Sequence, residues 1–181
     1  MMHTTIPLPD WLETLNRQSA PFASTRDAMA FVLAAASHNS GDGGGPFAAA
    51  VLDANLNLVA VGVNRVVAAQ GSILHAEMVA LLLAQQRLGS HDLASHGHFT
   101  LVTSCAPCAM CLGAIPFSGV QRVVCGARGE DAEAIGFDEG DKPDSWAQKL
   151  IDRGIAVELD VARDSAVAVL AEYRERGGVV Y

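Results

Sequence analysis

Two short segments decide how this chain is organised: His75-Ala76-Glu77 and, further along, Pro107-Cys108-Ala109-Met110-Cys111. Together they hold one imidazole and two thiols, which are ligands that zinc prefers, and a carboxylate that is free for other work. A structural zinc site closes all four positions with protein ligands, whereas a catalytic site leaves one position for water. Because the ligand count stops at three, His75, Cys108 and Cys111 are predicted to hold a catalytic zinc ion.

The spacing within each segment predicts that both lie at the start of a helix. Cys108 and Cys111 are three residues apart and therefore share a helical face. Pro107 fits the first turn of a helix, where its missing N–H is not needed. His75 opens an apolar run that ends at Gly89. We therefore expect helices over 75–88 and 107–117, with N-terminal dipoles that favour thiolate over thiol.

Glu77 is the predicted proton carrier of this site. A zinc ion with an open position lowers the pKa of bound water to about 7, and Glu77 would move that proton to the ring and the departing amine. Either segment alone has simpler interpretations, since Cys-x-x-Cys also occurs in redox pairs and as buried thiols. A redox protein requires neither His75 nor Glu77. The combination H-x-E followed by P-C-x-x-C is the signature of zinc-dependent nucleobase deaminases.

Composition indicates one domain that needs no disulfide scaffold. The chain has 181 residues, half of them hydrophobic, and no window typical of a transmembrane helix. The first ten residues lack the basic region of a signal peptide, so a cytoplasmic location is expected. Of the four cysteines, Cys105 and Cys125 lie in apolar runs and are predicted to be buried free thiols.

The net charge of −8 favours a small-molecule substrate. Nucleic-acid binders usually present a basic patch, and no cluster of Lys or Arg occurs here. We therefore expect neither a nucleic-acid partner nor a membrane partner.

Hydrophobic patterning predicts an α/β fold, namely a three-layer αβα sandwich with a five-stranded mixed sheet. Helices are expected over 25–37, 145–153 and 163–176 as well as in the two metal segments, and residues 128–144 are expected to form a polar loop. Strands are expected over 47–52, 56–64, 99–103, 122–126 and 155–159. The last two strands are joined through a helix and should be parallel. The predicted domain spans 25–176, between an N-terminal extension (1–24) and a C-terminal tail (177–181).

Both motifs and this layout resemble the cytidine deaminase-like superfamily over residues 25–181. The segment from Gly129 to Gly140 resembles the one that bacterial guanine deaminases of this superfamily carry after the fourth strand. That resemblance implies one Zn²⁺ per subunit, and it implies that Glu139, two places beyond Phe137, helps to bind and protonate the purine. The implied activity is hydrolytic deamination of guanine to xanthine and ammonia.

The resemblance also implies further substrate-binding positions. The Asn64 side chain would hydrogen-bond the base, Phe47 and Phe137 would line its pocket, and the N–H of Ala76 would face the substrate carbonyl or the zinc-bound water. In guanine deaminases of this kind the C-terminal segment is exchanged between the subunits of a homodimer, which would bring Tyr181 into the partner's site. One departure is Ala106, where many relatives have Glu, and this weakens the inference about substrate orientation.

Simpler roles stay open for these outer residues. Asn64 is also typical of a turn at a strand end, the two phenylalanines of ordinary core, Glu139 of a solvated loop and Tyr181 of a loose terminus. Alternative functions are deamination of cytosine, cytidine or an amino-triazine, and, with less support, transfer-RNA adenosine deamination. A non-catalytic zinc module is a further alternative, although it would need no Glu77.

Overall fold

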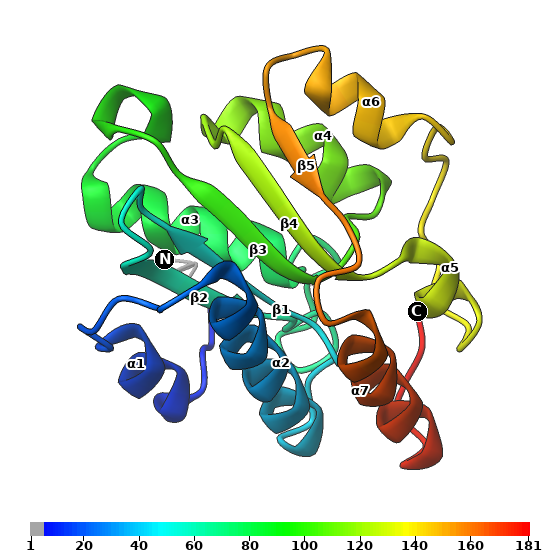
Figure 1. Cartoon of the computed structure of the whole chain (residues 1–181). Helices are drawn as coiled ribbons and strands as arrows, with labels where there is room; N and C mark the ends of the chain where they lie inside the picture. The colour runs from blue at the N-terminus through cyan, green and yellow to red at the C-terminus, as the bar shows by residue number, and fades with distance from the viewer. Residues whose placement is uncertain (1–5) are drawn as a thin grey trace, which may run out of the picture.

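The computed structural model describes residues 6–181 and contains one five-stranded sheet with helices on both faces (Figure 1). The strands lie in the order β2-β1-β3-β4-β5. Strand β1 is antiparallel to both of its neighbours, whereas β3, β4 and β5 are parallel. The strands are β1 (Ala48–Leu52), β2 (Leu58–Val63), β3 (Thr100–Cys105), β4 (Arg122–Ala127) and β5 (Ala156–Glu158). The predicted α/β sandwich with a mixed sheet is confirmed.

Helices α2 and α7 cover one face of the sheet, and α3 and α4 cover the other (Figure 1). The helices are α1 (Asp10–Asn16), α2 (Thr25–Gly41), α3 (Ala76–Leu88), α4 (Ala109–Ser118), α5 (Gly129–Glu133), α6 (Trp146–Ile151) and α7 (Arg163–Glu175), with a 3₁₀ turn at Leu93–His96. Within residues 6–181, no helix combines the length and the apolar character needed to cross a bilayer.

Strand β1 is apolar throughout because helices cover both of its faces. All five of its residues are buried. Ala48, Ala50 and Leu52 belong to the core cluster that includes α2, while Ala49 and Val51 belong to the cluster that includes α3. Successive side chains of a strand point to opposite faces, so a strand with helices on both sides favours apolar residues on both of them.

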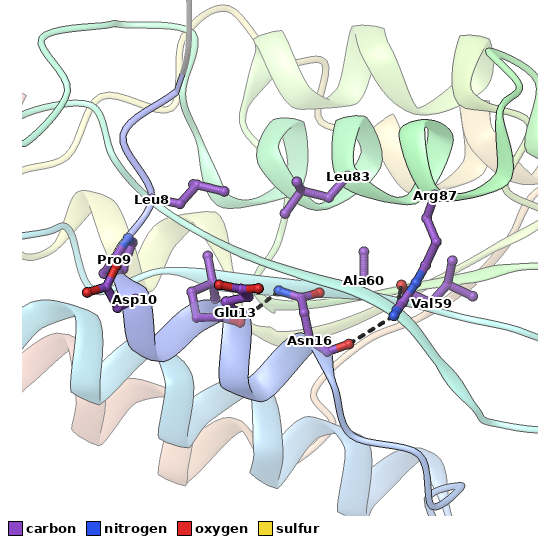
Figure 2. Close-up of a pocket in the computed structure, with 10 residues that line it drawn as sticks. Leu8, Pro9, Asp10, Glu13, Asn16, Val59, Ala60, Leu83 and Arg87 are labelled. Carbon is purple, nitrogen blue, oxygen red and sulfur yellow. Dashed lines mark hydrogen bonds between the residues drawn. The ribbon is translucent and has the colours of Figure 1, made fainter.

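The N-terminal extension covers the free edge of the sheet (Figure 2). The Asn16 side chain of α1 donates to the carbonyl of Val61 at 3.0 Å and accepts from its N–H at 2.8 Å. Arg87 donates to the carbonyl of Val59 at 2.6 Å. These side chains occupy backbone groups of β2 that would otherwise be open to another strand. Residues 1–5 of the predicted extension lie outside the described residues.

Several predicted boundaries are wrong by a few residues. Helix α4 begins at Ala109 with Cys108 as its N-cap, so Pro107 precedes the helix and does not lie in its first turn. His75 is likewise the N-cap of α3, and α2 continues to Gly41. The predicted polar loop over 128–144 contains the short helix α5, which has no apolar periodicity and is held by polar contacts of Asp131.

Candidate active site

The three predicted zinc ligands converge at the N-termini of α3 and α4. The candidate ligand atoms of His75, Cys108 and Cys111 lie within 4.8 Å of one another, and His75 Nδ1 is 3.5 Å from Cys108 Sγ. The two N-cap residues have extended backbones, while Cys111 lies in the first turn of α4. One imidazole and two thiols at this separation fit a zinc ion with one position left for a non-protein ligand. Among the residues that the structure describes, this is the only His/Cys/Asp/Glu group of three or more that is arranged to hold a metal.

The two cysteines share a proton in the metal-free protein. Hydrogen bonding from Cys111 is the main cause that lowers the pKa of Cys108, to about 4, and His75 contributes in the same direction. The pKa of Cys111 is raised, because its proton is held by the Cys108 thiolate and because burial disfavours a second charge. Both thiols must be deprotonated to bind a metal, so metal binding releases the shared proton.

Glu77 lies in the first turn of α3, almost completely buried beside the ligands. Burial, followed by the charge of Cys108, raises its pKa to about 7. The Thr103 hydroxyl lies 3.3 Å from Glu77 Oε1 and 2.9 Å from the carbonyl of Cys105. A hydroxyl has one proton to donate, so Thr103 can donate to the Cys105 carbonyl while it accepts from a protonated Glu77. The Glu77 carboxyl can therefore take up and release a proton near neutral pH.

A cavity of about 470 Å³ opens in front of these groups. Its size suits a small heterocycle, since ligand sites commonly measure about 300–1,000 Å³. The rings of Phe47 and Phe137 pack edge to face, with their centroids 4.8 Å apart. The ring of Tyr181 packs in the same way on Phe137, with a centroid distance of 5.2 Å. The predicted site residues that line the cavity are Phe47, Asn64, His75, Glu77, Cys108, Phe137, Glu139 and Tyr181.

Asn64 joins the end of β2 to the C-terminal tail. Its Oδ1 accepts from the N–H of Val66 at 3.2 Å, which is the turn contact expected of a strand-end asparagine. The same oxygen accepts from the Tyr181 hydroxyl at 2.5 Å. In the single chain the tail therefore folds back over the chain's own cavity, and Asn64 combines a turn role with a place in the cavity wall.

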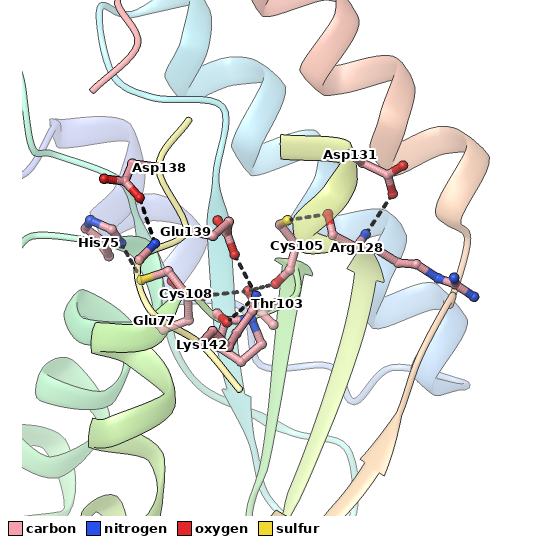
Figure 3. A network of polar contacts seen from close by, with 12 residues as sticks. His75, Glu77, Thr103, Cys105, Cys108, Arg128, Asp131, Asp138, Glu139 and Lys142 are labelled. Atoms are coloured by element: carbon pink, nitrogen blue, oxygen red, sulfur yellow. Dashed lines mark hydrogen bonds and ion pairs between the residues drawn. The ribbon is translucent and has the colours of Figure 1, made fainter. Parts of the chain in front are cut away.

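Glu139 is buried in the cavity wall and is not a solvated loop charge (Figure 3). Burial raises the pKa of its carboxyl, and the Lys142 ammonium, 2.8 Å from Oε2, opposes that rise. The backbone carbonyl of Glu139 also accepts from the N–H of Ala109 at 2.9 Å. The loop that follows α5 is thus attached directly to the helix that carries both cysteines.

Two predicted site residues do not line the cavity. Ala76 and Cys111 are fully buried behind the wall. As the first residue of α3, Ala76 has an N–H without a partner inside the helix. Ala106 lies at the wall, so a methyl group occupies the position where the resemblance leads one to expect Glu.

Sequence reasoning did not find Thr103 or Lys142. Thr103 sits within an apolar strand, and no local pattern marks it. Lys142 is an isolated cation three residues after Glu139 in an acidic segment, and that spacing was the available signal.

Comparison with known proteins identifies a family whose zinc-binding region this chain shares. The family model for the cytidine and deoxycytidylate deaminase zinc-binding region matches residues 23–127. The chain belongs to this family. The matched region contains both the His75–Glu77 and the Pro107–Cys111 segments, so the candidate zinc ligands and Glu77 all lie inside it.

Similar proteins extend this relationship beyond the zinc region. The guanine deaminase of Bacillus subtilis is 37% identical over 124 residues, which cover 68% of this chain and 73% of the relative. The structure of a guanine deaminase from Nitrosomonas europaea is 44% identical, with a TM-score of 0.93 over 96% of this chain and 97% of that one. A solved structure in complex with 2,6-diaminopurine is 46% identical, with a TM-score of 0.94 over 98% and 95%. The predicted membership of the zinc deaminase superfamily is confirmed.

Proposed function

We propose that this protein is a zinc-dependent guanine deaminase, a hydrolase of cyclic amidines that converts guanine to xanthine and ammonia. The observation that carries the proposal is one cavity lined by Glu77, Glu139 and two of the three candidate zinc ligands, His75 and Cys108. Similarity to guanine deaminases over nearly the whole chain supports guanine as the substrate. The reaction belongs to purine breakdown, and the four free cysteines fit a reducing compartment such as the cytoplasm.

One zinc ion per chain would be held by His75, Cys108 and Cys111. When bound, such an ion acidifies a water molecule to a pKa of about 7. The thiolate character of Cys108 and the closeness of the three ligand atoms support this assignment. The net reaction adds water at C2 of guanine, breaks the bond to the exocyclic amine and releases ammonia.

The other residues divide the work of binding and proton transfer. Glu77 takes a proton from the attacking water and delivers it to the ring and the amine, which its position and raised pKa support. Glu139 binds the polar edge of the base and assists its protonation. Asn64 offers an amide donor to the same edge, and Phe47 and Phe137 provide apolar surface for the flat ring. The N–H of Ala76 is directed to the substrate carbonyl or the water.

Ammonia release from a panel of bases tests this function. Guanine, adenine, cytosine, cytidine, guanosine and an amino-triazine would be compared, with wild type and the Glu77→Gln variant. We expect turnover of guanine by wild type and a loss of at least about 100-fold in the variant. Turnover of cytosine or the triazine without turnover of guanine would replace the purine assignment. No turnover in a fully zinc-loaded protein would favour a non-catalytic zinc module.

We also propose that the enzyme is a homodimer. A second cavity, of about 1,000 Å³, lies over α3 and α4, and its lining contains no acidic or basic side chain. Ile73 and Phe117 beside it are 62% and 81% exposed. Apolar surface of this kind commonly marks an interface. Sedimentation of wild type should give a dimer, and Phe117→Asp should shift it towards the monomer.

Exchange of the C-terminal tail between subunits remains part of this proposal. A tail that crosses to the partner would make in trans the Tyr181–Asn64 contact that the single chain makes with itself. Two inactive variants distinguish these arrangements. Tyr181→Ala and Glu77→Gln would be co-expressed. With exchange, a heterodimer regains one intact site that combines Glu77 of one chain with Tyr181 of the other. With tails folded back on their own chains, no activity returns.

A further inference from the structure

The Lys142 ammonium pairs with the carboxylate of Glu139, which lies in the cavity wall (Figure 3). We propose that Lys142 is a positioning residue that sets the place of the Glu139 carboxylate relative to the zinc-binding cysteines. This inference deepens the proposed function and rests on it, since it concerns how one substrate-binding group is held. Lys142 does not border the cavity and is not expected to touch substrate.

The ammonium of Lys142 connects the two halves of the site. It donates to Glu139 Oε2 at 2.8 Å and to the carbonyl of Pro107 at 3.1 Å. Pro107 immediately precedes the first cysteine ligand, so a single cation bridges the substrate-binding loop and the metal-binding segment. The ring of Trp146 lies 5.6 Å from the same nitrogen and provides a further favourable contact.

The backbone reinforces the same connection. The Glu139 carbonyl accepts from the N–H of Ala109, the residue next to Cys108. This contact fixes the main chain of Glu139, but it leaves the torsions of its side chain free. Lys142 supplies the contact that fixes the carboxylate itself.

Gly129 leaves the space that the ion pair needs. A Cβ atom at this position would lie 2.7 Å from Lys142 Nζ and 3.1 Å from Glu139 Oε2. Its φ angle is not in the left-handed region, so the backbone itself would accept a side chain. The nearest obstacle is the far end of a flexible side chain. Gly129→Ala is therefore expected to displace the pair without removing either charge.

An ion pair that only stabilised the fold would not need to lie at the cavity wall. The side chains of Lys142 and Glu139 are 12% and 8% exposed, and a buried pair is often no more stabilising than apolar residues of the same volume. The pair lies at the cavity wall and its ammonium also contacts Pro107, so a misplaced Glu139 carboxylate would lower turnover. A shift of about 1 Å in a reacting group can cost about 100-fold in rate.

A double-mutant cycle tests whether Lys142 acts through Glu139. Lys142→Met, Glu139→Gln and the double variant would be assayed for ammonia release from the base that wild type deaminates fastest, together with zinc content. We expect Lys142→Met to lower kcat by about 10- to 100-fold with zinc retained. The double variant should be no slower than Glu139→Gln alone, because the partner to be positioned is already lost. Lys142→Arg, which keeps the cation and its donors, should restore most of the activity.

Two controls separate positioning from a general loss of stability. Lys149 is exposed, and Lys149→Met should leave kcat unchanged. Gly129→Ala should lower kcat although both charges remain, and this variant carries the test if Lys142→Met does not fold. Losses in the double variant that multiply, or full activity in Gly129→Ala, would overturn the inference.

Failure of the proposed function can be told apart from failure of this inference. If wild type deaminates cytosine and not guanine, the substrate assignment fails while the cycle is still measured on cytosine. A crystal structure of Lys142→Met gives a readout independent of turnover. The Glu139 carboxylate should have moved away from the Pro107 segment, and an unmoved carboxylate would refute the role of Lys142.

Discussion

Gly62 of strand β2 sets how closely α3, with Glu77 in its first turn, approaches the sheet. A Cβ atom on Gly62 would lie 2.8 Å from the carbonyl oxygen of Ala76 and 2.9 Å from Cα of Ala80, and nearer still to the Ala80 amide nitrogen. All three obstacles are backbone atoms of α3, so no side-chain rotation relieves them. Since ordinary contact begins near 3.4 Å, Gly62→Ala must push α3 and β2 apart by at least 3.4 − 2.8 = 0.6 Å at the Ala76 carbonyl.

Two effects of Gly62→Ala are expected from this displacement. Overpacking of a close contact costs about 1–3 kcal/mol, and the upper part of that range applies because both partners are backbone. For a domain of this size, about 2–3 kcal/mol lowers the Tm by about 4–12 °C. The first turn of α3 carries Glu77 and adjoins His75, so kcat for guanine should also fall, by about 10- to 100-fold.

Thermal unfolding and steady-state kinetics would measure these effects, with Gly113→Ala as the matched control. Gly113 lies in the other metal helix, α4, and a Cβ there would meet nothing within 4 Å. Replacement of a helical glycine by alanine is worth about 0.5–1 kcal/mol, so this variant should melt at or above the wild-type temperature with unchanged kcat. An unaltered Tm and kcat in Gly62→Ala, or equal losses in both variants, would refute the argument from close approach.

Three further outcomes are expected from the site and its supports. Glu77→Gln should keep full zinc content while losing activity, and a loss of zinc would show that the carboxylate is itself a ligand. Saturating zinc should stabilise wild type by about 2.7 kcal/mol at 100 times its Kd, and Cys111→Ser should shift that response to higher zinc concentration in a thermal titration. The hydrogen bond from Arg163 lowers the pKa of Asp131, so its stabilisation is complete above about pH 3.9 and disappears as the pH falls through the lowered pKa. Asp131→Asn should therefore be less stable than wild type in urea at neutral pH, with a difference that shrinks in acid, and a difference independent of pH would contradict this assignment.

The candidate zinc site was largely predictable from the sequence because most of its spacing follows local rules. Cys108 and Cys111 are brought together by one turn of helix, and His75 is fixed two residues before Glu77 at the start of another. Cys108 and Cys111 need only one helical turn to share a face, whereas His75 joins them only because α3 and α4 pack against each other. Strands β1 to β4 were equally visible, because they are buried almost throughout and read as largely apolar runs, whereas β5 is a short, mostly exposed edge strand.

Short elements held by polar contacts were not predictable in this way. Helix α1 is anchored by Asn16 to the edge of the sheet, and α5 is anchored by Asp131 to an arginine on α7. Helix α5 shows no apolar period, and α1 is too short for the spacing of Trp11, Leu12 and Leu15 to stand out, although these side chains pack on the core. Their stability comes from partners far away in the sequence, which no local pattern records.

The sequence by itself determined the α/β class and predicted the candidate zinc ligands and Glu77 as the proton carrier, because helical spacing and strand burial depend on neighbouring residues. Only the tertiary structure decided that Thr103 supports Glu77, that Lys142 holds Glu139, and that Tyr181 reaches Asn64. Thr103 and Tyr181 reach partners far away in the sequence, whereas Lys142 pairs with a residue of its own loop that the sequence alone does not place beside it. A hydrogen bond or ion pair exists only where folding brings its donor within reach of its acceptor. Local sequence patterns therefore predicted the reactive groups of the site, whereas packing decided which other residues line its cavity.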